Sequence, residues 1–304
     1  MSVDADSAGG NESDFKFEYY HYNPSLPAAI VSVAVFAILT SVHVWKLFRF
    51  RTFYFTAFTI GGVFQCIGYC GRIWAHFDDT ALGGFVMQAI LILVAPALYA
   101  ASIYMILGRL IRTLHAEDLS SIPVKWLTKI FVAGDVVAFG LQGSGGGIQA
   151  GGTSKSYKRG ERIILAGLFV QIAIFSIFVI TASTIHRRIG KSPTPAGVQR
   201  TIPWRRHLYA LYASSVLILV RSIFRVIEYI QGNGGYLFAH EIFLYIFDAL
   251  LMAMVMVIFA VWYVADLQKN QSAVYALSSV SRRSVERSEM YQAGQSKMSD
   301  EKRI

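Results

Sequence analysis

The chain has 304 residues, of which 54% are hydrophobic and only 15% are charged. Soluble proteins carry about 25% charged residues, so the composition excludes an ordinary soluble domain and favours a membrane protein. The formal net charge is +9, but no segment combines basic and aromatic residues in the way of a nucleic-acid-binding module. The charge therefore indicates attraction to anionic lipids rather than binding of nucleic acid.

The first 23 residues are polar and acidic, and we expect them to form a disordered extracellular segment. Asn11 begins the triplet Asn11-Glu12-Ser13, an N-glycosylation sequon that an outside N-terminus would make available. The first apolar run is too long for the core of a cleavable signal peptide. We therefore expect the first helix to act as its own targeting signal.

The region 24–267 contains seven apolar stretches long enough to cross a hydrocarbon layer of about 30 Å at 1.5 Å per residue. The fourth stretch is the weakest, because Asp135, Gln142 and a run of glycines dilute its hydrophobicity. The sequence thus predicts an all-α, polytopic bundle of seven transmembrane helices, followed by a disordered basic tail over 268–304. The predicted spans are roughly 26–46, 53–71, 83–107, 126–148, 163–185, 208–230 and 238–264.

Basic residues indicate the orientation, because cytoplasmic loops hold the excess of Lys and Arg. An outside N-terminus and a cytoplasmic C-terminus place most of the basic loop residues inside. One predicted outer loop runs against this rule, since it contains Lys155, Lys158, Arg159 and Arg162.

Charged residues occur inside the last two predicted spans, where charge is costly and usually functional. Arg221, Arg225 and Glu228 are spaced i, i+4 and i+7, and so are Glu241, Tyr245 and Asp248. Each set occupies one face of its helix, so the two polar stripes are able to face each other.

Further polar residues in the spans extend this set toward the outer side. The depth of each predicted span places Asp135 near the midplane, Gln142 and Gln171 in the outer half, and Arg72 at the outer end of the second span. Together with the two stripes they suggest a water-accessible cavity, which we predict to be a site of substrate binding and translocation. Purely structural ion pairing, for example between Arg225 and Glu228, is the competing interpretation.

Pro96 lies in the middle of the third span. It lacks a backbone N–H, so it leaves the carbonyl of Ile92 free, and we expect a kink or a cavity-lining break there.

Other sites are disfavoured. Cys66 and Cys70 lie at i and i+4 in one span, which favours packing over metal binding. The glycine run 143–147 is followed by Ser154 and Lys155 rather than by the Gly-Lys pair of a nucleotide-binding loop. No catalytic triad motif is present, so we expect no enzyme activity, no cofactor and no metal.

Several segments resemble the fungal RTA-like family of lipid-translocating exporters over roughly residues 20–266. The Arg-to-Glu block is the most specific of them, whereas Trp262 to Asp266 depart from the family's ending. The resemblance implies seven membrane helices and a link to amino-sterol tolerance, to movement of sphingoid long-chain bases and, in some branches, of porphyrins. The segments are Gly68–Arg72, Ala95–Tyr104, Asp135–Val137, Leu141–Gln142, Gly145–Gly147, Gly167–Gln171, Arg221–Glu228 and His240–Asp248.

Residues and resemblance together suggest a transporter of membrane lipids, with the cationic amine of a sphingoid base lying among acidic side chains, namely Glu228, Glu241, Asp248 and Asp135. The expected location is the plasma membrane, with the vacuolar or another internal membrane as the alternative. A seven-helix lipid or stress sensor without transport is the rival function, while the absence of Lys from the last span excludes a retinal protein. The sequence does not predict an oligomeric state.

Overall fold

The computed structural model describes residues 25–77, 82–114, 116–119, 123–149, 154–191, 204–231, 237 and 240–263. In these segments all regular structure is helical, which confirms the predicted all-α fold. The two predicted terminal segments, 1–23 with the sequon at Asn11 and 268–304, lie outside the described residues.

Seven long helical segments follow one another along the described part of the chain. Pro27 lies in the first turn of α1, where its missing N–H costs no hydrogen bond, and Arg51 ends that helix in the left-handed conformation at φ 54°. The short 3-10 helices η1 (Phe53–Phe55) and η2 (Glu117–Leu119) stand in connections. The long helices are α1 (Leu26–Phe50), α2 (Thr56–Phe77), α3 (Leu82–Thr113), α4 (Val124–Gln149), α5 (Ser154–Lys191) and α7 (Trp204–Gln231).

The seventh segment is continuous but changes its winding. It consists of α9 (Glu241–Leu244), a π-helix labelled η3 (Tyr245–Leu250) and α10 (Leu251–Val261). Short π-helical stretches inside α-helices occur frequently at functional sites. This one contains Asp248, a predicted site residue.

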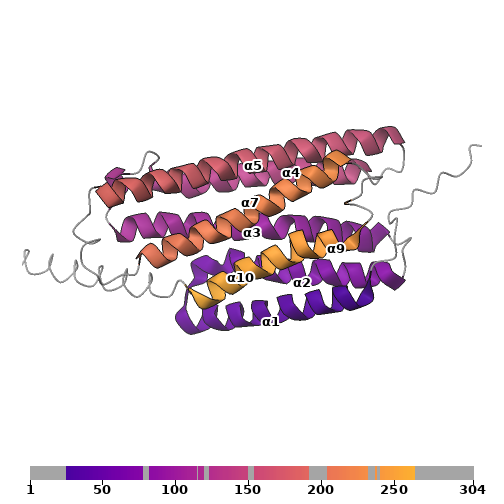
Figure 1. Cartoon of the computed structure of the whole chain (residues 1–304), viewed down its shortest axis with the longest axis horizontal. Helices are drawn as coiled ribbons and strands as arrows, with labels where there is room; N and C mark the ends of the chain where they lie inside the picture. Colours follow the sequence, from indigo (N-terminus) through magenta and orange to yellow (C-terminus); the bar gives the residue numbers. More distant parts are fainter. Residues whose placement is uncertain are drawn as a thin grey trace, which may run out of the picture.

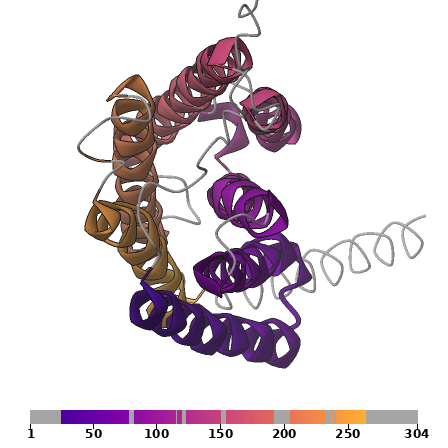
Figure 2. The same cartoon turned by 90° about the vertical axis from the view of Figure 1, so that its right-hand side faces the viewer.

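The helices lie along the long axis of the molecule, with α7 crossing the others obliquely (Figure 1). Seen along that axis, they follow one another around a ring (Figure 2). Each helix packs against the next, and α10 closes the ring by packing against α1, while α3 also reaches α7. Residues from helices on opposite sides of the ring are therefore able to meet in its interior.

The outer surface of the ring is apolar. Val31 and Ile38 on α1 are 61% and 64% exposed, and Ile180 on α5 is 64% exposed. Contiguous exposed apolar side chains of this kind mark a surface that meets lipid. Together with the helical fold, they identify an integral membrane protein.

Six of the helical segments are long and apolar enough to span a membrane, and α4 is the long helix that is not among them. The polar and glycine content that made the fourth span the weakest prediction accounts for this result. Its outward face is nevertheless apolar, because Trp126, Ile130, Val136 and Val137 are all more than half exposed. α4 thus completes the ring of seven helices between α3 and α5.

The predicted outer loop before the fifth span is wrong. α5 begins at Ser154 rather than near residue 163, so Lys155 and Arg162 belong to its first turns and not to a loop. Its 38 residues correspond to about 57 Å of helix, which exceeds the thickness of the hydrocarbon layer. Part of α5 therefore extends beyond the lipid, and an extension at its start would keep Lys155 and Arg162 in water.

Glycine allows α4 and α5 to pack closely. A Cβ atom on Gly145 would lie 2.7 Å from the backbone oxygen of Gly160, and one on Gly160 would lie 2.4 Å from that of Gly145. Gly146 and Gly147 have open space around them. Small residues at helix contacts permit close approach in membranes, so the glycine run is a packing surface on a helix.

Candidate functional site

Among the residues that the structure describes, the most buried ion pairs are centred on Asp248. Its side chain is fully buried and accepts hydrogen bonds from two arginines of α7, with Oδ1 bonded to Arg221 and Oδ2 to Arg225. Arg221 is itself 1% exposed. A carboxylate shared by two guanidinium groups is well compensated for the loss of water.

Arg221 also joins α7 to α3. Its Nη2 donates a hydrogen bond to the backbone oxygen of Ile92 at 3.0 Å. Pro96, which lies inside α3, has no N–H to offer to that oxygen. The carbonyl that the sequence predicts to be free thus accepts a hydrogen bond from the buried Arg221.

A second ion pair links α2 to the seventh segment. Arg72, which is 1% exposed, donates to Glu241 Oε1 from Nη2 at 2.7 Å and from Nε at 3.1 Å. The same Nε lies 3.1 Å from the hydroxyl of Tyr245. Both oxygens of Glu241 also accept from the backbone N–H of Ser25, which lies just before α1.

The two polar stripes therefore face each other only in part. Asp248 meets Arg221 and Arg225 as predicted, and Arg225 also holds Glu228 at 2.9 Å on its own helix. Glu241 and Tyr245 instead turn toward Arg72 on α2. Helix periodicity predicts the face on which each residue lies, but not which neighbouring helix covers that face.

The remaining predicted residues form separate pairs. Asp135 is 4% exposed, and its Oδ2 accepts a hydrogen bond from the hydroxyl of Tyr104 on α3 at 2.9 Å. Gln142 donates to Gln171 across α4 and α5 at 3.0 Å. The two sets of ion pairs together contain three arginines (Arg72, Arg221, Arg225) and three acids (Glu228, Glu241, Asp248), which we call the charged cluster. The predicted site had four acids because it included Asp135. In the structure Asp135 is bonded to Tyr104 instead, so acids and arginines are equal in number.

Two interior residues of α2 were not predicted. Gln65 and Tyr69 are both 0% exposed, and their side-chain polar atoms have no hydrogen-bond partner among the described residues. Gln65, Tyr69 and Arg72 are spaced i, i+4 and i+7, so they lie on one face of α2. This spacing in the sequence could have predicted a polar face on that helix. Buried polar groups of this kind usually have a partner in protein, water or ligand.

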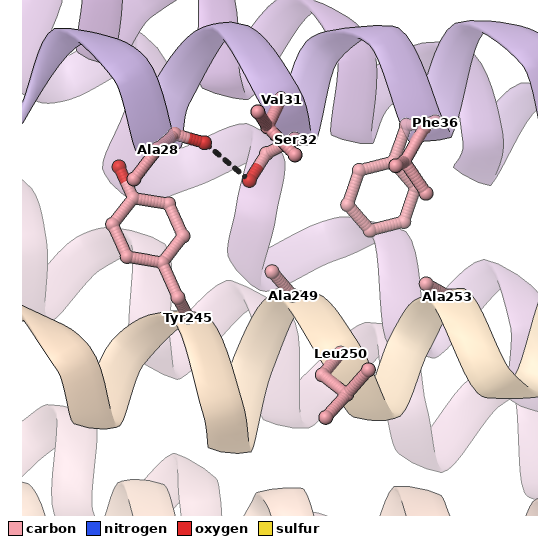
Figure 3. Close-up of a pocket in the computed structure, with 9 residues that line it drawn as sticks. Ala28, Val31, Ser32, Phe36, Tyr245, Ala249, Leu250 and Ala253 are labelled. Carbon is pink, nitrogen blue, oxygen red and sulfur yellow. Dashed lines mark hydrogen bonds between the residues drawn. The ribbon is translucent and has the colours of Figure 1, made fainter.

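A cavity of about 250 Å³ lies between α1 and the seventh segment. Figure 3 shows Tyr245 directed toward Ala28 at one end and Phe36 opposite Ala253 at the other. Val31 and Leu250 in its wall are 61% and 51% exposed, so the cavity is a groove on the lipid-facing surface. Its lining residues are Ala28, Val31, Ser32, Val35, Phe36, Tyr245, Ala249, Leu250 and Ala253.

The described residues hold no group of three or more His, Cys, Asp or Glu side chains suited to a metal ion. Cys66 lies 3.9 Å from the hydroxyl of Thr40 on α1.

Comparison with known proteins gives a consistent set of relatives. A family model described as "RTA1 like protein" matches residues 58–271. Protein RTA1 of Saccharomyces cerevisiae is 37% identical over 270 residues, which cover 81% of this chain and 84% of that protein. No solved structure matches the chain.

Two further yeast relatives have names that state a substrate. Protoporphyrin uptake protein 1 of S. cerevisiae is 35% identical over 82% of this chain and 93% of its own length. The sphingoid long-chain base transporter RSB1 of the same species is 26% identical over 82% of this chain and 74% of its own length.

Proposed function

Because this chain belongs to the RTA1 like protein family, we propose that it transports amphiphilic lipids with a cationic amine headgroup, such as sphingoid long-chain bases. The observation that carries the proposal is the cluster of Arg72, Arg221, Arg225, Glu228, Glu241 and Asp248, buried where α2, α3, α7 and the seventh segment meet. The sphingoid base transporter among the relatives supports this class of substrate.

In the proposed mechanism, the amine of the substrate replaces an arginine at one of the acids. Glu241 suits this role because its side chain is 15% exposed, whereas that of Asp248 is 0% exposed. An ammonium group binding to Glu241 takes over the charge compensation that Arg72 supplies. Ion pairs that exchange partners in this way give the bundle two arrangements, which alternating exposure of a substrate requires.

A second candidate substrate is a porphyrin. It is favoured by the protoporphyrin uptake protein, which is 35% identical to this chain. The propionate groups of a porphyrin are anionic and would bind arginine rather than Glu241. Charge substitutions at Glu241 and Arg72 therefore distinguish the two candidates, since each removes the partner of only one headgroup.

We place the N-terminus outside and the C-terminus in the cytoplasm, and the protein in the plasma membrane. Lys46, Arg49 and Arg51 lie at the end of α1, and Arg109 and Arg112 at the end of α3. These positions share one side of a bundle of successive helices and agree with the positive-inside rule.

The test is release of a labelled sphingoid base to an external acceptor, from yeast cells lacking their own family members. Wild type and Glu241→Gln are compared at equal surface expression. We expect wild type to accelerate release over empty cells and Glu241→Gln to abolish at least 90% of that increase. Glu117→Gln is the matched control, because Glu117 is 61% exposed in a loose pair with Arg112.

Three other results contradict the proposal in different ways. Release by wild type equal to that of empty cells rejects export of this substrate. If the protein takes up a porphyrin and this uptake depends on Arg72 but not on Glu241, the substrate is the anionic porphyrin instead. Binding of the base without flux establishes the sensor function instead.

A further inference from the structure

The groove between α1 and the seventh segment is elongated and lined mainly by apolar side chains. Its walls run from Ala28 to Phe36 on one side and from Tyr245 to Ala253 on the other. Eight residues of helix correspond to about 12 Å. The small side chains of Ala28, Ala249 and Ala253 leave this space, and aromatic rings stand at both ends, as Figure 3 shows.

One end of the groove adjoins the charged cluster. Tyr245 lines the groove with its ring, while its hydroxyl lies 3.1 Å from Arg72 Nε. Glu241 stands one helical turn before Tyr245, and the N–H of Ser25 that it binds precedes Ala28 by three residues. Both walls therefore lead to the same carboxylate.

Glu241 already accepts several hydrogen bonds, so an incoming ammonium group would replace a donor rather than add to them. Its Oε1 accepts from Ser25 and twice from Arg72, whereas Oε2 accepts from Ser25. A carboxylate offers about four lone-pair directions, and the contacts from Ser25 and Arg72 already equal that number. Of the three acids in the cluster, Glu241 also has the most exposed side chain, at 15% against 6% and 0%.

Tyr69 connects the groove to the interior. Its ring is stacked on Phe36 at a centroid distance of 5.5 Å and on Tyr245 at 6.1 Å. The hydroxyl of Tyr69 is buried and has no hydrogen-bond partner among the residues described. A polar donor and acceptor thus lies behind the apolar wall, in contact with both aromatic ends of the groove.

We infer that this groove binds the hydrocarbon chain of a single-chain cationic amphiphile, with its ammonium group at Glu241. The inference rests on the proposed function and adds to it the place where the substrate leaves or joins the bilayer. Apolar walls and an acidic end match such a molecule, whereas a choline phospholipid would bring a phosphate next to Glu241.

The test uses the full-length protein in phosphatidylcholine nanodiscs and sphingosine that carries a photoreactive diazirine in its chain. We expect the label in peptides of α1 and α10, and a decrease of at least fivefold in Ala253→Phe, which fills the groove. Met254→Phe is the matched control, because Met254 lies on the same helix, is 44% exposed and does not line the groove. Ala28→Phe tests the opposite wall if Ala253→Phe fails to fold.

Equal labelling of Ala253→Phe, Ala28→Phe and wild type overturns the inference. So does equal labelling of the groove by a diazirine phosphatidylcholine, which would make it a site for bilayer lipid. Export measured in parallel separates the two proposals. Normal export by groove variants that have lost the label rejects the groove as the place where the substrate leaves or joins the bilayer, and keeps the transporter. Specific labelling without any export by wild type rejects the transporter.

Discussion

Arg221 on α7 donates a hydrogen bond to the backbone oxygen of Ile92 on α3, across 3.0 Å. The acceptor is available because Pro96, four residues later, has no N–H to bond to it. Arg221 is only 1% exposed, and its guanidinium group thus donates to a backbone oxygen as well as to Asp248. Proline inside α3 is part of the charged site and not only a source of irregular helix geometry.

Pro96→Ala is expected to impair transport while leaving the protein folded. Alanine restores an N–H that competes with Arg221 for the Ile92 oxygen. Removing an interior proline favours the helix by about 3 kcal/mol, and loss of a hydrogen bond to a charged group costs about 1.5–3 kcal/mol, so the two effects nearly cancel in stability. The measurement is export rate together with Tm in detergent.

Pro27→Ala is the control for that substitution, because Pro27 lies in the first turn of α1, where no intrahelical bond is lost. Export by Pro96→Ala at the wild-type rate would show that the Arg221 contact with Ile92 has no functional role.

Asp248→Asn and Asp135→Asn are expected to differ sharply in stability. Asp248 compensates two buried arginines, and breaking a buried pair costs about 3–5 kcal/mol. Asp135 has one hydrogen bond, from Tyr104, and no arginine or lysine partner among the described residues. Its asparagine variant should therefore lose less than about 1 kcal/mol, the size of one ordinary hydrogen bond.

Thermal unfolding of both variants in the same detergent provides the comparison. The double variant Asp248→Asn/Arg221→Met, with one charge fewer of each sign, should recover part of the lost stability. Equal Tm values for the two single variants would contradict the assignment of Asp248 as the centre of the cluster.

Arg72→Gln is expected to raise the affinity for a sphingoid base, although it removes a buried ion pair. If the ammonium group competes with Arg72 for Glu241, removal of the competitor strengthens binding, by about fivefold for an interaction of about 1 kcal/mol. The apparent affinity is measured with a tritiated base in nanodiscs. Arg112→Gln, which removes an exposed arginine of the same type, should leave the affinity unchanged, and weaker binding by Arg72→Gln would refute the exchange mechanism.

The sequence predicts much of this arrangement, and the parts it misses have physical reasons. The i, i+4, i+7 spacing places Arg221 and Arg225 on one face, and the proline predicts a free Ile92 carbonyl, because both follow from local helix geometry. The pairing of Arg72 with Glu241 depends on how α2 packs against a helix far along the chain, and local spacing contains no information on that.

The start of α5 and the groove were missed for related reasons. Lys155 and Arg162 have the polarity of a loop, yet they belong to α5. Hydropathy identifies apolar spans and does not report a polar helical segment. Ala28 and Ala249 are ordinary residues of two separate apolar helices. They form a groove only because α1 and the seventh segment meet at the closure of the ring.

The glycine run of α4 offers a matched pair of substitutions. Gly145→Ala is expected to destabilise the protein, because the new Cβ would lie 2.7 Å from the Gly160 backbone oxygen and force α4 away from α5. Gly146→Ala meets nothing within 4 Å and should stabilise the protein by about 0.5–1 kcal/mol, since alanine loses less backbone entropy in a helix. Thermal unfolding of the two variants tests the sign of each change. Equal shifts would mean that α4 and α5 do not pack through Gly145, because helix propensity alone acts equally at both positions.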